Sequence, residues 1–222
     1  MVQTFLYHAL ATGVSGIITL PFQDVIQVQA PSALPFTGGY SASRAEGFRH
    51  KNIVTFSSAS TVTTGSESGG FFNTLATATV EGLNILDVIT ADRVVARLAS
   101  KYSKDAREQS ATFAGSHFHN LRIAGYPLAV VISPDRMKPP PRSAKTQFGP
   151  FKAPIDLKGC TGLELLEDGA IHIAEFGKIY LAESLVTASY QTISMVRVVL
   201  GCAVGGNVSV AQASTNGEPM PG

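Results

Sequence analysis

Alternation of apolar and polar residues over long stretches constrains the fold of this chain more than any other feature. In the stretch Ala76–Tyr102, for example, Val94, Ala96 and Leu98 recur at every second position. Because successive side chains of a β-strand point to opposite faces of a sheet, this period indicates a half-buried strand. The end of the stretch also fits one face of a helix, but its β-branched residues favour a strand.

A second alternating stretch, Ser116–Ile132, is likewise expected to form extended strands, broken by Gly and Asx turns. His117, His119, Leu121 and Ile123 are expected on one face of it. Two histidines placed two residues apart on a strand are a spacing that metal ligands use. The alternative is a pair of polar strand residues that form ordinary hydrogen bonds, and nothing in the sequence places a third ligand nearby.

Short extended segments separated by Gly, Pro and Asx turns continue through the chain. They predict one all-β domain over residues 1–222, with two antiparallel sheets packed as a β-sandwich or jelly-roll. Near the C-terminus, Val196, Val198 and Leu200 alternate with Met195 and Arg197. The expected core residues are Val80, Leu83, Val94, Leu98, Leu121, Ile123, Val130, Ile173, Val196 and Val198.

The two ends of the chain receive separate predictions. The first 22 residues have no basic residue before their apolar run, so we interpret them as a pair of strands divided at Gly13 and Gly16, with no evident signal peptide. No run of 18 apolar residues indicates a membrane-spanning helix. Residues 214–222, rich in small and turn-forming residues, are expected to form a flexible tail.

A basic, proline-rich segment at residues 133–150 is expected to project from the domain as an extended loop. Proline lacks a backbone donor and fixes φ, so this segment does not fit a central strand. Its cations Arg136, Lys138, Arg142 and Lys145 could bind a partner, or the segment could be a solvated connection.

Composition excludes several classes of protein. Charged residues make up 15% of the chain and hydrophobic residues 45%, which is incompatible with intrinsic disorder. The net charge of +1 gives no reason to expect a nucleic acid partner. The two cysteines, Cys160 and Cys202, fit either a disulfide or two buried thiols. No catalytic or cofactor-binding motif is present, so no cofactor is expected.

One resemblance adds to these predictions. The segment ATATVEGLNILDVITADRVVARLAS and the later SHFHNLRIAGYPLAV resemble strands of the bacterial surface proteins called the choice-of-anchor P family. This resemblance implies a β-rich domain that is extracellular or associated with the cell surface. The matching residues are Val80, Gly82, Leu83, Thr90, Ala91, Asp92, Phe118, Asn120, Leu121, Ile123 and Gly125.

Three functions are therefore compared. The first is a structural, self-assembling protein, such as a subunit of a coat, filament or surface layer, which works as a homo-oligomer and has no enzymatic activity. The second is a non-catalytic binding module for a glycan, an apolar ligand or a protein. The third is a metal-dependent enzyme that uses His117 and His119. The dispersed polar residues and low charge favour the first.

Overall fold

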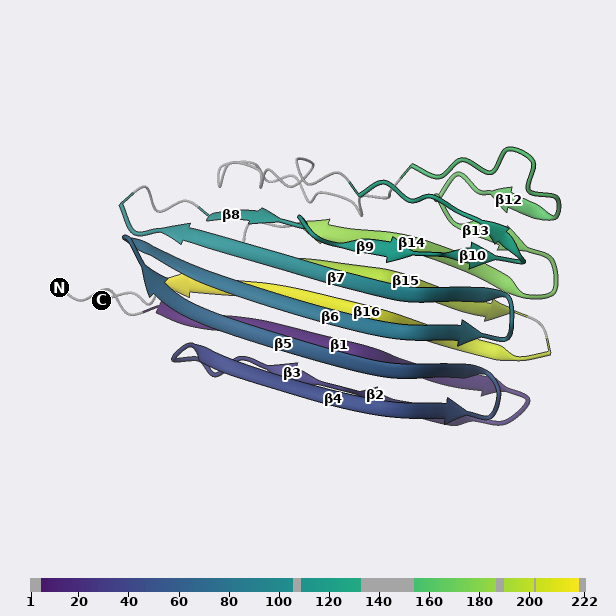
Figure 1. Cartoon of the computed structure of the whole chain (residues 1–222), viewed down its shortest axis with the longest axis horizontal. Helices are drawn as coiled ribbons and strands as arrows, with labels where there is room; N and C mark the ends of the chain where they lie inside the picture. Colours follow the sequence, from purple (N-terminus) through teal and green to yellow (C-terminus); the bar gives the residue numbers. More distant parts are fainter. Residues whose placement is uncertain (1–4, 106–108, 133–153, 187–189, 202, 220–222) are drawn as a thin grey trace.

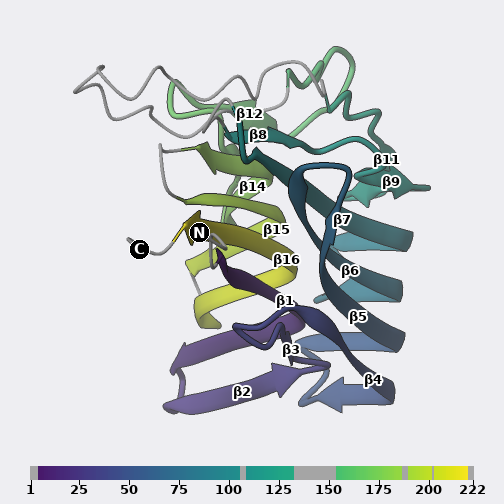
Figure 2. The ribbon, with the colours of Figure 1, turned by 90° about the vertical axis from the view of Figure 1, so that its left-hand side faces the viewer.

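The protein is an all-β sandwich of two antiparallel sheets (Figure 1). The computed structural model describes residues 5–105, 109–132, 154–186, 190–201 and 203–219, and these contain no helix. Figure 2 shows the two sheets face to face, with their outer surfaces pointing away from one another. The predicted fold class is therefore confirmed.

Sheet A contains eight strands in the order β12-β13-β14-β15-β16-β1-β2, and β3 also pairs with β1. The N-terminal strand therefore lies between the C-terminal strand and β2. The bounds of these strands are β1 Phe5–Leu20, β2 Asp24–Gln29, β3 Ser32–Ala33, β12 Leu163–Leu165, β13 Ile171–Ile173, β14 Gly177–Val186, β15 Gln191–Gly201 and β16 Gly205–Pro219.

Sheet B follows the order β11-β10-β7-β6-β5-β4, and three short strands, β8, β9 and β10, pair one after another along the same strand, β7. The bounds are β4 Gly39–His50, β5 Val54–Ser68, β6 Phe71–Ile85, β7 Ile89–Ser103, β8 Gln109–Thr112, β9 His117–His119, β10 Arg122–Ile123 and β11 Tyr126–Pro127.

One hydrophobic core fills the space between the sheets. Its members come from both sheets, and Phe5 of β1 stacks on Phe72 of β6 across it, with ring centroids 4.3 Å apart. Most of the predicted core residues are buried, and the exceptions Val130 and Ile173 are only partly buried against the core. The fully buried ones are Val80, Leu83, Val94, Leu98, Leu121, Ile123, Val196 and Val198.

Three local predictions are wrong. Residues 5–20 form one continuous strand, because β1 continues through Gly13 and Gly16 and pairs with β16 on both sides of them. Residues 214–219 are not a flexible tail, since β16 continues to Pro219 and pairs with β1 as far as Phe5. The expected common face of His117, His119, Leu121 and Ile123 is not found, because the two histidines are exposed whereas Leu121 and Ile123 are buried. The division of this stretch by turns, into β9, β10 and β11, is as predicted.

In both sheets, strands contain a point at which two consecutive residues face the same side of the sheet. These points lie side by side in a transverse row, and beyond the row the inward and outward positions of each strand are exchanged. In sheet A, consecutive residues are both buried, as at Met195–Val196 and Val210–Ala211. In sheet B, consecutive residues both face outward, as at Glu81–Gly82 and Asp92–Arg93. Bulge-like irregularities of this kind bend a strand and re-aim its side chains. The row therefore decides which side chains reach the outer surface of sheet B.

Candidate functional site

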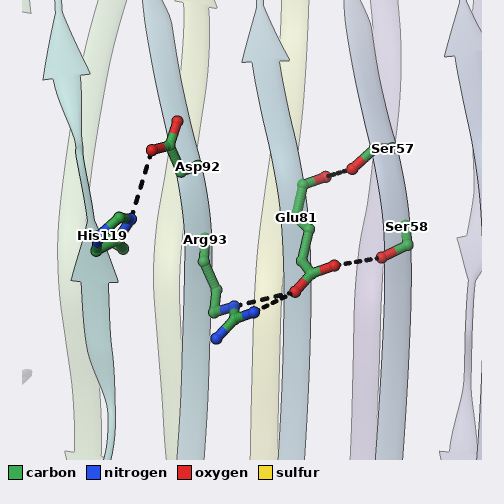
Figure 3. Close-up of polar contacts among 6 residues, drawn as sticks. All are labelled: Ser57, Ser58, Glu81, Asp92, Arg93 and His119. Atoms are coloured by element: carbon green, nitrogen blue, oxygen red, sulfur yellow. Dashed lines mark hydrogen bonds and ion pairs between the residues drawn. The ribbon is translucent and has the colours of Figure 1, made fainter.

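The outward-facing part of this row carries a line of polar side chains across sheet B. Register pairs Ser58 with Glu81, Glu81 with Arg93, and Arg93 with His119, so each lies directly beside the next on a neighbouring strand. Figure 3 shows the contacts of Glu81 with Ser58 and Arg93, and the contact of His119 with Asp92. Cross-strand neighbours of opposite charge stabilise a sheet, which is the simplest role for this arrangement.

Glu81 is the centre of the line. Its Oε1 accepts hydrogen bonds from Arg93 Nη2 at 2.7 Å and Nε at 3.0 Å, and its Oε2 accepts one from Ser58 Oγ at 3.0 Å. The Arg93 guanidinium, followed by the Ser58 hydroxyl, lowers the pKa of the Glu81 carboxyl. Both carboxylate oxygens thus already have partners, and the group suits a structural role better than proton transfer.

The two predicted metal ligands, His117 and His119, do lie on one exposed face of β9, as the sequence predicts. His119 Nδ1 lies 3.4 Å from Asp92 Oδ2, and His117 Nδ1 lies 2.8 Å from the Gly115 carbonyl oxygen. Within the described part of the chain, no three His, Cys, Asp or Glu side chains are grouped so that they could hold a metal ion.

The other histidines lie elsewhere and do not complete that pair. His8 lies on the outer surface of sheet A, His172 lies beside Glu164 in the β12–β13 region, and His50 contacts Asp24. The predicted partner-binding cations Arg136, Lys138, Arg142 and Lys145 lie outside the described residues. Cys160 is partly buried, and Cys202 lies outside the described residues.

A second polar network stabilises the outer surface of sheet A. Arg197 donates to both carboxylate oxygens of Glu183, at 2.6 and 2.8 Å, and its guanidinium lies 3.8 Å from the ring centroid of Tyr180. The Tyr180 hydroxyl donates to Asp168 at 3.0 Å. Glu183 raises the pKa of Arg197, and burial, followed by Asp168, raises the pKa of Tyr180. All four groups are engaged with one another.

The most unusual surface of the molecule is the hairpin formed by β1 and β2. Five large apolar side chains of this hairpin are exposed, with exposed fractions from 49% to 77%. We call them the hairpin patch: Ile17, Leu20, Phe22, Val25 and Val28. Ile17 and Val25 are paired neighbours, so these two members of the patch lie side by side on adjacent strands. Sets of exposed apolar side chains of this kind mark interaction surfaces.

A groove of about 360 Å³ lies near the other end of β1, on the outer surface of sheet A. Strand pairing brings its walls together, since register places His8 opposite Asn216 and Leu10 opposite both Ser214 and Ala33. The lining residues used below are His8, Leu10, Phe36, Tyr190, Ser214 and Asn216. No Asp, Glu, Lys or Arg is among the described residues that line it.

Sequence reasoning missed both apolar surfaces. The hairpin patch has a local signal, because apolar residues occupy both alternating faces of β1 and β2 rather than one. The groove has none, since its walls come from residues 8–10, 33–36 and 190–216, which only the pairing of β1 with β3 and with β16 brings together.

Comparison with known proteins assigns a family but not an activity. Residues 5–154, or 150 of the 222 residues, match the family described as Domain of unknown function (DUF8256). The chain belongs to this family. The matched range contains all of sheet B and the strands β1–β3, and therefore the hairpin patch, but not β12–β16. No curated protein and no solved structure matches the chain.

No helix in the described residues is long and apolar enough to cross a membrane.

Proposed function

We propose that this protein is a structural subunit that assembles with copies of itself through the β1–β2 hairpin, without a catalytic step. The observation that carries the proposal is the hairpin patch, in which Phe22 is 77% exposed and its four companions are about half exposed. A monomer gains nothing from leaving such a set of side chains in water, whereas an assembling subunit can cover them.

The edge strand that carries part of this patch also lacks the usual protection against pairing. β2 is the last strand of sheet A, and among the described strands only β1 pairs with it. Its six residues, DVIQVQ, contain one charged side chain, Asp24, which contacts Lys51 at 2.6 Å and His50 at 3.1 Å. Beyond Asp24, β2 has no charge and no proline, and edge segments of this kind are prone to associate with another chain.

The edge strand of sheet B on the same side provides a contrast. β4 exposes Arg44, Glu46 and Arg49, and Gly47 interrupts its register at a φ of +62°. Charged side chains and bulges of this kind discourage edge-to-edge pairing. Because β2 and β4 lie side by side at one edge of the sandwich (Figure 2), the difference favours β2 as the associating strand.

Sedimentation velocity over a range of concentrations tests this proposal. Covering one half-exposed aliphatic side chain contributes about 1 kcal/mol, so a lysine in the patch should weaken association measurably. We expect the wild type to associate and Val25→Lys to shift toward the 23.3 kDa monomer. The matched control is Leu165→Lys, because Leu165 is also about half exposed but lies on β12 at the opposite edge of sheet A.

A wild-type protein that remains monomeric at every concentration would contradict the proposal, as would equal effects of the two lysine substitutions. That the assembly forms at a bacterial surface stays a prediction from the resemblance to the choice-of-anchor P family. A non-catalytic binding module is the second candidate function, and the groove on sheet A is the observation that favours it.

A further inference from the structure

The hairpin patch and the groove lie at opposite ends of the same strand. The β1–β2 turn that carries Phe22 follows Leu20, whereas His8 and Leu10 of the groove lie near the start of β1. Figure 1 shows this turn at one end of the long axis and the chain termini at the other. At roughly 3.3 Å per residue, the ten residues from Leu10 to Leu20 separate the groove from the turn by about 33 Å.

We propose that the groove receives Phe22 from a second copy of this chain, so that the subunits associate head to tail. This inference rests on the proposed function and names the surface that the hairpin contacts. Because the two surfaces differ and are far apart on one subunit, the contact is heterologous, and repeating it forms an open filament or a ring.

Size and exposure support this pairing. Phe22 has the largest exposed fraction of any large apolar side chain in the described residues, at 77%, and it lies in a turn where it can enter a recess. An apolar cavity of roughly 150 Å³ suffices to hold benzene, so the groove of about 360 Å³ can accept a phenyl ring.

The chemistry of the two surfaces also matches. The groove presents the rings of His8 and Phe36, whose centroids lie 4.9 Å apart in an edge-on arrangement, together with Leu10 and Tyr190. An entering phenyl ring can pack against these rings in the tilted or edge-on geometries that aromatic pairs prefer. An uncharged turn, Leu20–Gln23, would enter a groove whose described lining has no acidic or basic side chain except the imidazole of His8.

Complementary single substitutions test the contact. Phe22→Asp removes the inserted ring but leaves the groove, and Leu10→Asp disrupts the groove but leaves the ring. Both side chains are more than half exposed, so the folded chain should tolerate each change. We expect each substitution to lower the association constant at least about tenfold. Phe36→Asp, at a position 61% exposed, is a second groove variant in case Leu10→Asp does not fold.

Mixing the two variants gives the decisive result. The groove of the Phe22→Asp chain can accept the intact hairpin of the Leu10→Asp chain, and no further subunit can add. An equimolar mixture should therefore form a dimer, measured by sedimentation velocity and mass photometry, while each variant alone remains monomeric.

The outcomes separate this inference from the proposed function. If the wild type does not associate, both are overturned. If the wild type associates and Val25→Lys weakens it, but Leu10→Asp and Phe36→Asp associate normally, the hairpin assembles and the groove is not its partner. If both single variants are monomeric and their mixture is too, the head-to-tail contact is refuted.

Discussion

Replacing Gly206 with alanine should destabilise this protein far more than an ordinary glycine substitution. Gly206 lies in β16 opposite Ile18 of β1, close to the hairpin patch. A Cβ atom at this position would lie 2.2 Å from the Ile17 carbonyl oxygen and 2.8 Å from the Ile18 Cα. Both neighbours are backbone atoms, so the two strands would have to separate and lose hydrogen bonds of the ladder.

A second glycine provides the matched control. Gly125, in the β10–β11 turn, has a φ of +82°, but no atom lies within 4 Å of a Cβ built there. Gly125→Ala should therefore cost only the strain of a positive φ, about 1–2 kcal/mol, partly offset by a less flexible unfolded chain. Gly206, with a φ of +142°, adds the backbone clash, which should bring the loss to about 4 kcal/mol or more.

Thermal unfolding followed by circular dichroism measures the difference. For a chain of this length, 1 kcal/mol shifts Tm by roughly 2–4 °C, so Gly125→Ala should lower Tm by a few degrees and Gly206→Ala by about 10 °C or more. Gly206→Ala should also weaken association, because it displaces the strand that carries the hairpin patch. Equal Tm values for the two variants would refute the close approach of β1 and β16.

Two further predictions concern polar groups. Glu183→Gln should lower the free energy of unfolding by about 1–2 kcal/mol, because it weakens a partly buried bidentate pair with Arg197. Glu81→Gln, in a more exposed pair, should lower it by less than about 1 kcal/mol, and urea denaturation measures both losses. Burial, followed by Glu67, raises the pKa of the Tyr7 phenol above 10.0. The resulting stabilisation is complete below pH 10 and is lost as the pH rises through the raised value, so Tyr7→Phe should lose less stability than the wild type in alkaline urea titrations.

Alternation predicts individual strands well because it reports a local property. β7 forms a strand over Ile89–Ser103 as expected, with Val94, Ala96 and Leu98 all fully buried. β2 is likewise a short β-branched run, which lies between Pro21 and Pro31. In both cases the residues that decide the structure are neighbours in the sequence.

The same alternation is wrong where one residue leaves the extended conformation. Asn120 has a φ of +51°, which ends β9 and reverses the faces of the following residues. His117 and His119 are therefore exposed, whereas Leu121 and Ile123, predicted on the same face, are buried. Asn tolerates the left-handed region better than most residues, but its presence alone does not show that the chain turns there.

The transverse row is a second limit of the same kind. Met195 is fully buried although alternation with Val196 places it on the opposite face. The reason lies on neighbouring strands, where Ala182 and Ala211 adopt φ values of +50° and +49° in the same row. Because the irregularity extends across paired strands, no single stretch of sequence contains the information that predicts it.

The amino-acid sequence of β1 supports assembly more strongly than any one exposed residue does. Its inward face carries small residues, including Ala9 and Ala11, whereas Leu10 and Ile17 on its outward face are half exposed. In a sheet with one solvated face, polar residues outside and apolar residues inside fix the register, since a slip by one residue exposes the core. β1 gives up part of this specification, because its outward face carries Leu10 and Ile17 beside polar residues such as Thr12 and Ser15. Under the proposed head-to-tail contact, a second subunit would cover Leu10 and restore this specification, because only the observed register places Ala9 in the core and Leu10 in the groove.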